Sequence, residues 1–251
     1  MANTLEQSDA RPKPAAWGLL GTLLWGALIA LGFIVVQVAA AFTHVKANNP
    51  SASAEELLKL LEAAAGTGSI LSIATVASTI VGCSLTAGAI KLKKGSVLGE
   101  YLCLRAVSAR ALLKWLGYVA VFIAVTDLFT VMIGRPVVAP FMSDIYATAN
   151  PLWLLLLALI VAAPLFEEVF FRGFLFAGLQ SSFLGSTGAI LTTAVVWALI
   201  HIQYDAYGMV IVVLLGLLLG WARLASGSLY VPMSMHALSN LVATLETALL
   251  S

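Results

Sequence analysis

Long apolar runs, each close to the length needed to cross a membrane, dominate the sequence. A spanning helix needs about 20 mainly apolar residues. Seven such segments follow one another, at residues 16–41, 66–90, 113–134, 151–180, 187–204, 207–225 and 229–250. The first is too long for the apolar part of a signal peptide, which covers about 7–15 residues, so we expect it to be retained. The pattern predicts an all-α fold, a polytopic membrane bundle of about seven transmembrane helices.

The composition supports this prediction. Of the 251 residues, 61% are hydrophobic and 10% are charged, whereas about a quarter of the residues of a soluble domain are charged. The expected surroundings are therefore a lipid bilayer. The formal net charge of +1 gives no reason to expect a nucleic-acid partner. Cys83 and Cys103 fit neither a disulfide framework nor a metal-ligand spacing, so we expect free thiols.

Positive charges gather between the second and third apolar runs. This loop, residues 91–114, contains six basic side chains: Lys91, Lys93, Lys94, Arg105, Arg110 and Lys114. Lysine and arginine are enriched in cytoplasmic loops, so we expect this loop and the polar N-terminus, residues 1–15, in the cytoplasm. Seven crossings then place the C-terminus outside the cell (plasma) membrane. We predict N-terminal transmembrane helices over 16–134 and a second helix bundle over 151–250.

Polar side chains interrupt three of the last four apolar runs, where an ionisable group costs several kcal/mol unless it is paired or hydrated. The three motifs are Glu167-Glu168-Val-Phe-Phe-Arg172, Trp197-Ala-Leu-Ile-His201 and His236-Ala-Leu-Ser-Asn240. Glu168 and Arg172 are four residues apart on a helix and can pair. Glu167 lies about 100° around the same helix and is free to point elsewhere. His236 and Asn240 again share one face. We expect the motifs to converge around one polar pocket.

Two other interpretations of these residues remain open. Both glutamates can serve Arg172 in a buried structural network, with the histidines bonded to neighbouring helices. Intramembrane Glu and His also mark proton relays, which would indicate a proton- or ion-coupled transporter. A transporter predicts polar residues along a path across both leaflets and often a duplicated half. The sequence instead gathers them in its last four helices.

At these residues the sequence resembles the CPBP family of intramembrane proteases, also called the CAAX-protease and bacteriocin-processing (Abi) family. The family pattern is EExxxR, then FxxxH, then HxxxN, and the resemblance spans about residues 164–240. Trp197 stands where the family usually has phenylalanine. The resemblance implies a hydrolase, an endopeptidase like the CAAX prenyl endopeptidase, acting on a peptide or protein substrate at the membrane. A non-catalytic member that binds a peptide, for example in immunity to bacteriocins, is a further alternative.

The resemblance also implies a role for each motif residue. Glu167 would be the general base for water, and His201 would hold and polarise that water. His236 and Asn240 would donate hydrogen bonds to the oxyanion. Glu168 and Arg172 would hold the helix and tune the charge near Glu167.

A bound metal is an alternative within this interpretation. Two histidines and one carboxylate can form a zinc site with an open position, and the family is often labelled metalloprotease. There is no HExxH motif, and the ligands would come from three helices. We expect no cofactor, with zinc as the alternative.

Overall fold

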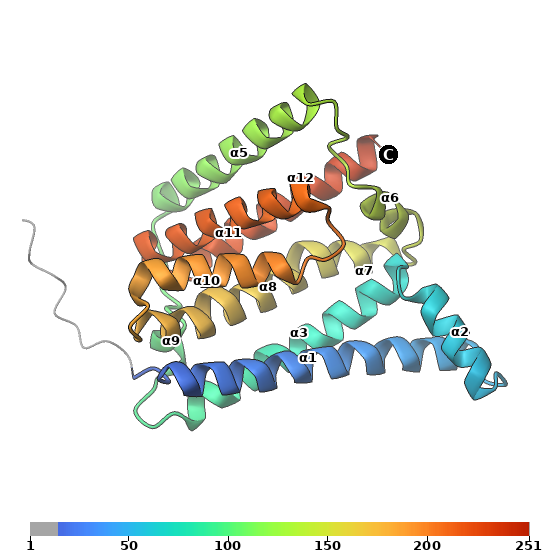
Figure 1. Ribbon diagram of the computed structural model, residues 1–251, viewed down its shortest axis with the longest axis horizontal. Coiled ribbons are helices and arrows are strands. Elements are labelled where there is room, and N and C mark those ends of the chain that lie inside the picture. The colour runs from blue at the N-terminus through green and yellow to red at the C-terminus, as the bar shows by residue number, and fades with distance from the viewer. Residues whose placement is uncertain (1–14, 251) are drawn as a thin grey trace, which may run out of the picture.

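The computed structural model describes residues 15–250, so nearly all of the predicted polar N-terminus, 1–15, lies outside the described residues. Within the described part every regular element is a helix (Figure 1). The N-terminal half contains α1 (Leu19–Asn48), α2 (Ala54–Ala64), α3 (Gly68–Leu92), α4 (Leu98–Tyr101), α5 (Ala109–Met132) and α6 (Pro140–Ala147). One continuous helix follows, made of α7 (Leu152–Leu157), η1 (Ala158–Ala162), α8 (Ala163–Glu167), η2 (Glu168–Leu175) and α9 (Phe176–Gln180). The last three helices are α10 (Gly185–Leu199), α11 (Ala206–Ser226) and α12 (Tyr230–Leu250).

The predicted all-α membrane bundle is confirmed. Five described helices are long and apolar enough to cross a membrane: α1, α3, α5, the continuous helix Leu152–Gln180 and α11. The other two predicted crossings are α10, which is apolar but has only 15 residues, and α12, which has 21 residues and carries several polar side chains. The seven helices run roughly side by side (Figure 1).

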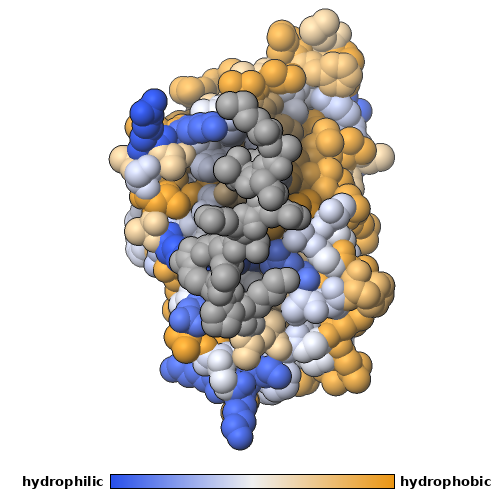
Figure 2. Space-filling model, turned by 90° about the vertical axis from the view of Figure 1, so that its left-hand side faces the viewer, coloured by the Kyte–Doolittle hydropathy of each residue, from blue (hydrophilic) through white to orange (hydrophobic). Residues whose placement is uncertain are grey.

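The basic loop, residues 91–114, lies at one end of the bundle, the left end in Figure 1. The α9–α10 and α11–α12 turns lie at the same end (Figure 1). Figure 2 views this end and shows hydrophilic side chains gathered on it, with hydrophobic side chains along the flanks of the bundle. α2 and α6 lie at the opposite end (Figure 1). The basic residues of the 91–114 loop are therefore concentrated at one end of the bundle.

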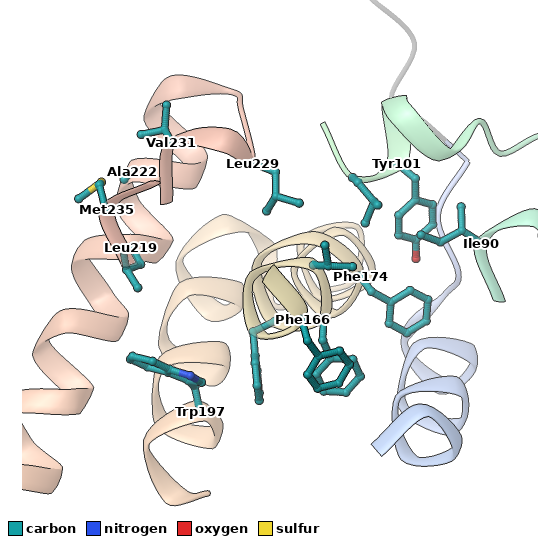
Figure 3. Close-up of a cluster of buried hydrophobic side chains, with 14 of the residues drawn as sticks. Ile90, Tyr101, Phe166, Phe174, Trp197, Leu219, Ala222, Leu229, Val231 and Met235 are labelled. Atoms are coloured by element: carbon teal, nitrogen blue, oxygen red, sulfur yellow. The ribbon is translucent and has the colours of Figure 1, made fainter. Parts of the chain in front are cut away.

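One face of the continuous helix is fixed by aromatic packing against the N-terminal helices. Phe33 of α1 stacks on Phe166 of α8 with ring centroids 4.1 Å apart, and Phe170 stacks on the same ring at 5.5 Å. Gly82 allows α3 to approach this stack, because a Cβ atom there would lie 2.4 Å from the Phe166 ring. Small residues permit such close crossings of membrane helices. The opposite face of the helix turns toward α10, and Figure 3 shows Trp197 of α10 on that side and Tyr101 and Ile90 on the other.

Two π-helical segments, η1 and η2, interrupt the continuous helix. The first directly precedes Pro164, which has no N–H to donate. The N–H of Ala163 bonds to the carbonyl of Ala158, five residues back. Ala163, the α-helical donor for the Leu159 carbonyl, is thereby used elsewhere, and Pro164, the π-helical donor position, has no N–H. The side-chain amide of Asn240 in α12 donates to the Leu159 carbonyl at 2.8 Å. Wide turns of this kind are frequent at functional sites.

The chain leaves α10 at Leu199, whereas the sequence predicted a helix to residue 204. Asp205 is the N-cap of α11 and accepts a hydrogen bond from the Gly208 N–H, which requires extended backbone at Asp205. Asp205 also pairs with Arg135, which holds the turn against the segment after α5. His201 consequently lies in the α10–α11 turn and not in a helix.

Candidate functional site

Side chains from three helices meet on the inner face of the continuous helix. Glu167 is the last residue of α8, and Glu168 and Arg172 lie in η2. Trp197 reaches them from α10 and His236 from α12. The first and third motifs are thus brought into direct contact. The second motif takes part through its tryptophan.

Glu168 is the fully buried centre of a charged cluster. Its side chain has 0% exposure, and its Oε1 atom lies 2.9 Å from Arg172 Nη1 and 2.9 Å from His236 Nδ1. Arg172 is also fully buried and donates to the Gly216 carbonyl of α11 at 3.3 Å. The helical pairing predicted for Glu168 and Arg172 is present. Because this carboxylate already has two donors on one oxygen, it acts in the structure as a connection between helices.

Glu167 points away from that pair, as its position around the helix predicted. Its Oε2 atom accepts a hydrogen bond from the indole Nε1 of Trp197 at 2.5 Å and lies 3.9 Å from Nε2 of His236. Its side chain retains 18% exposure. This carboxylate is therefore the part of the cluster that water or a substrate can approach.

The contact with Glu168 sets the tautomer of His236. A carboxylate only accepts hydrogen bonds, so Nδ1 of His236 carries the proton, and in a neutral ring Nε2 is then an acceptor facing Glu167. With both glutamates ionised, Arg172 charged and His236 neutral, the four groups carry a net charge of −1. One additional proton on His236 or Glu167 would bring the net charge of the four groups to zero.

His201 lies outside the charged cluster and contacts it through Trp197. Its Nδ1 atom is 2.7 Å from the backbone carbonyl of Trp197, so this nitrogen is the donor and Nε2 is free to accept. Its ring meets the edge of the Trp197 ring with centroids 4.9 Å apart. The Trp197 ring meets His236 in the same manner at 5.2 Å. The two histidines are therefore placed around one indole.

Asn240 is occupied by the backbone of the neighbouring helix. One of its two amide protons goes to the Leu159 carbonyl, as described above. The second amide proton is available to another acceptor. In this structure Asn240 holds α12 against the π-helical segment that precedes Glu167.

Two residues near the site had no role in the sequence prediction. Trp197 was taken only as the aromatic residue of its motif, yet its N–H bonds to Glu167. Tyr204 follows His201 by three residues in the same turn and packs edge-on against Phe141 of α6. Burial and the nearby charge of Glu167 raise the pKa of Tyr204. Neither contact can be read from helical spacing, because both join segments that are far apart in sequence.

Among residues 15–250, no three side chains of His, Cys, Asp or Glu are placed to share a metal ion. Nδ1 of His236 and Oε1 of Glu168 bind each other, and the nearest partner of Glu167 is an indole N–H. The chemistry that these residues offer is a carboxylate poised to accept a proton, with imidazoles beside it. A shallow apolar groove of about 450 Å³ between α5 and α11 does not include any motif residue in its lining.

Comparison with known families agrees with the motifs. Residues 149–242 match the model of the family described as type II CAAX prenyl endopeptidase Rce1-like. This stretch, fewer than half of the residues, contains all three motifs and extends from just before α7 into α12. The family resemblance predicted from the motifs is confirmed. No curated protein and no solved structure matches the chain.

We expect Arg172→Met to destabilise the protein strongly, because it leaves the buried Glu168 carboxylate without its cation. The loss of one partner of a buried ion pair costs about 3–5 kcal/mol. The double variant Arg172→Met/Glu168→Gln removes both charges and should recover much of that loss. Thermal unfolding in detergent measures both. A single variant as stable as the wild type, or a double variant no better than the single, would contradict this account of the cluster.

Proposed function

We propose that this chain is an intramembrane endopeptidase that hydrolyses peptide bonds of membrane-associated proteins or C-terminal peptides. The match of residues 149–242 indicates a membrane protease of the CAAX type in general. The observation that carries the specific proposal is the position of Glu167. Its carboxylate is held by one donor, is still partly exposed, and lies 3.9 Å from the imidazole Nε2 of His236.

Glu167 is the proposed general base. Peptide hydrolysis requires a base that takes a proton from water as the water oxygen adds to the scissile carbonyl carbon. A water molecule hydrogen-bonded at about 2.8 Å to both Glu167 Oε2 and His236 Nε2 would fit their separation. The proton taken up by Glu167 would then pass to the leaving amine nitrogen as the C–N bond breaks. His201, with Nε2 free, is proposed to hold and polarise the water from the other side of Trp197.

His236 and Asn240 are the proposed oxyanion donors. His236 can donate from Nε2 only in its protonated form, because its Nδ1 proton is committed to Glu168. The proposed mechanism therefore requires His236 to carry a second proton when the tetrahedral intermediate forms. Asn240 would use its second amide proton. Donors of this type, fixed in a site of low dielectric constant, lower the energy of the developing negative charge.

Glu168 and Arg172 are proposed to position the reacting groups without touching the substrate. Glu168 orients the imidazole of His236, and Arg172 balances the charge of Glu168. No metal enters the proposed steps, since the donor set does not fit one.

A proton-coupled transporter is the alternative, and one observation favours it. Asp127 of α5 and Glu246 of α12 are neighbouring, partly buried acidic side chains outside the motif cluster. Acidic side chains at several places in a membrane protein are typical of proton paths. The protease proposal depends instead on the first cluster alone. Cleavage products that depend on Glu167 therefore separate the two functions.

The proposed orientation puts the basic end of the bundle in the cytoplasm of a cell with this protein in its plasma membrane, and the C-terminus outside. Six Lys and Arg residues at 91–114 support it. Cys103, in this segment and partly exposed, can report the side. In a Cys83→Ala background, a membrane-impermeant thiol reagent should label Cys103 only after the cells are permeabilised. Labelling of Cys103 in intact cells would show that the protein has the opposite orientation.

We expect Glu167→Gln to abolish cleavage, since an amide cannot accept a proton from water. The experiment compares the membrane proteomes of cells that express the wild type and the variant, and seeks peptide fragments found only with the wild type. Glu62→Gln, an exposed glutamate of α2, is the matched control and should leave these fragments unchanged. Equal fragments from the wild type and Glu167→Gln would remove the proposed base.

We expect cleavage to persist after treatment with a strong zinc chelator. The purified protein in detergent, incubated with the chelator and then with a peptide that contains an identified cleavage site, should retain the rate of the untreated protein. Loss of the rate, with recovery on addition of zinc, would show that a metal participates.

A further inference from the structure

Trp197 makes directed polar contacts with the charged cluster in addition to apolar packing. Its side chain is 2% exposed, and its Nε1 donates to Glu167 at 2.5 Å. The Arg172 guanidinium lies over its ring, 4.5 Å from the centroid. His201 and His236 meet the same ring edge-on. The indole thus touches a member of each motif.

We propose that Trp197 is a positioning residue for Glu167, an inference that rests on the proposed hydrolase function. The indole N–H holds Oε2 in place. It takes one acceptor direction of this oxygen and keeps it 3.9 Å from Nε2 of His236, so the remaining acceptor direction of Oε2 is left for the water. A single donor of fixed direction thereby sets where on the carboxylate the water binds.

The ring has a second consequence for Glu167. Arg172 lies over the ring, while the Glu167 carboxylate lies at its N–H edge. The indole therefore contacts both groups, and no ion pair joins Arg172 to Glu167 among residues 15–250. Arg172 makes its ion pair with Glu168 instead. A direct ion pair between Arg172 and Glu167 would compete with proton transfer, because a carboxylate that binds a guanidinium is a weaker base.

A phenyl ring at position 197 would fill only part of this space and could not donate to the carboxylate. If Trp197 only packs in the core, its N–H is dispensable, whereas the proposed positioning of Glu167 requires it. Replacement of Trp197 by 3-benzothienylalanine, in which sulfur takes the place of the N–H, tests this group with the shape of the ring kept. Trp221→Phe is the matched control, since Trp221 packs on Trp115 and Tyr118 far from the motifs.

The first measurement needs no substrate. The full-length protein, labelled with nitrogen-15 and purified in detergent, gives indole N–H signals from its six tryptophans. The Trp197 signal is the one lost in Trp197→Phe. Glu167→Gln should move that signal and leave the others, whereas Glu62→Gln should move none. A Trp197 signal that Glu167→Gln leaves in place would overturn the proposal.

The second measurement uses a peptide with a cleavage site identified in the membrane comparison. Loss of a hydrogen bond to a charged group should lower the cleavage rate of the benzothienylalanine variant at least about tenfold. Its thermal unfolding midpoint should match that of the wild type, and Trp221→Phe should retain full rate. An unchanged rate, while Glu167→Gln is inactive, would overturn the role of Trp197 and leave the hydrolase proposal standing. Fragments that persist in Glu167→Gln would instead end the hydrolase proposal, and the nitrogen-15 signal would still decide whether Trp197 holds Glu167.

Discussion

The burial of one carboxylate, Glu168, governs the arrangement of the C-terminal helices. A charge with no exposure in a membrane bundle must be matched by donors on the elements around it. Arg172 comes from the same helix, and His236 comes from α12, so satisfying the charge fixes the rotation of both helices. Arg172 adds the Gly216 carbonyl of α11 to the network. The position of the more exposed Glu167 follows, because its neighbour in sequence cannot turn without breaking these contacts.

A backbone carbonyl near the glutamates is also satisfied by a side chain from a neighbouring helix. Pro164 cannot donate to a carbonyl of the preceding turn, and in the wide turn before it the Leu159 carbonyl accepts from Asn240 instead. An unpaired carbonyl in lipid costs several kcal/mol, so the amide stabilises both the turn and the docking of α12. Asn240 thus has a structural task in addition to the one proposed for it at the oxyanion. Effects of substitution at Asn240 on activity will combine the two.

The sequence was sufficient for the fold class and for the pairing of Glu168 with Arg172. Apolar runs of spanning length predicted the membrane bundle, and spacing of four residues predicted the contact of Glu168 with Arg172. Contacts between helices could not be derived this way, because the relative rotation of two helices depends on packing along their whole length. The bond from Trp197 to Glu167 and the contact of His236 with Glu168 are of this kind. The end of α10 was missed for a local reason, since the cap at Asp205 required extended backbone where apolar periodicity suggested more helix.

The close approach of α3 at Gly82 has a consequence for the part of the chain outside the family match. α1 and α3 contribute no motif residue, yet they cover the phenylalanine face of the helix that carries both glutamates. Lipid tails could also solvate those rings, so the two helices are not needed to shield them. Unlike fluid lipid chains, however, the two helices form a rigid surface against which the phenylalanine rings pack. Any side chain at position 82 would push this surface away from the Phe166 ring, and with it the support for the helix that carries both glutamates.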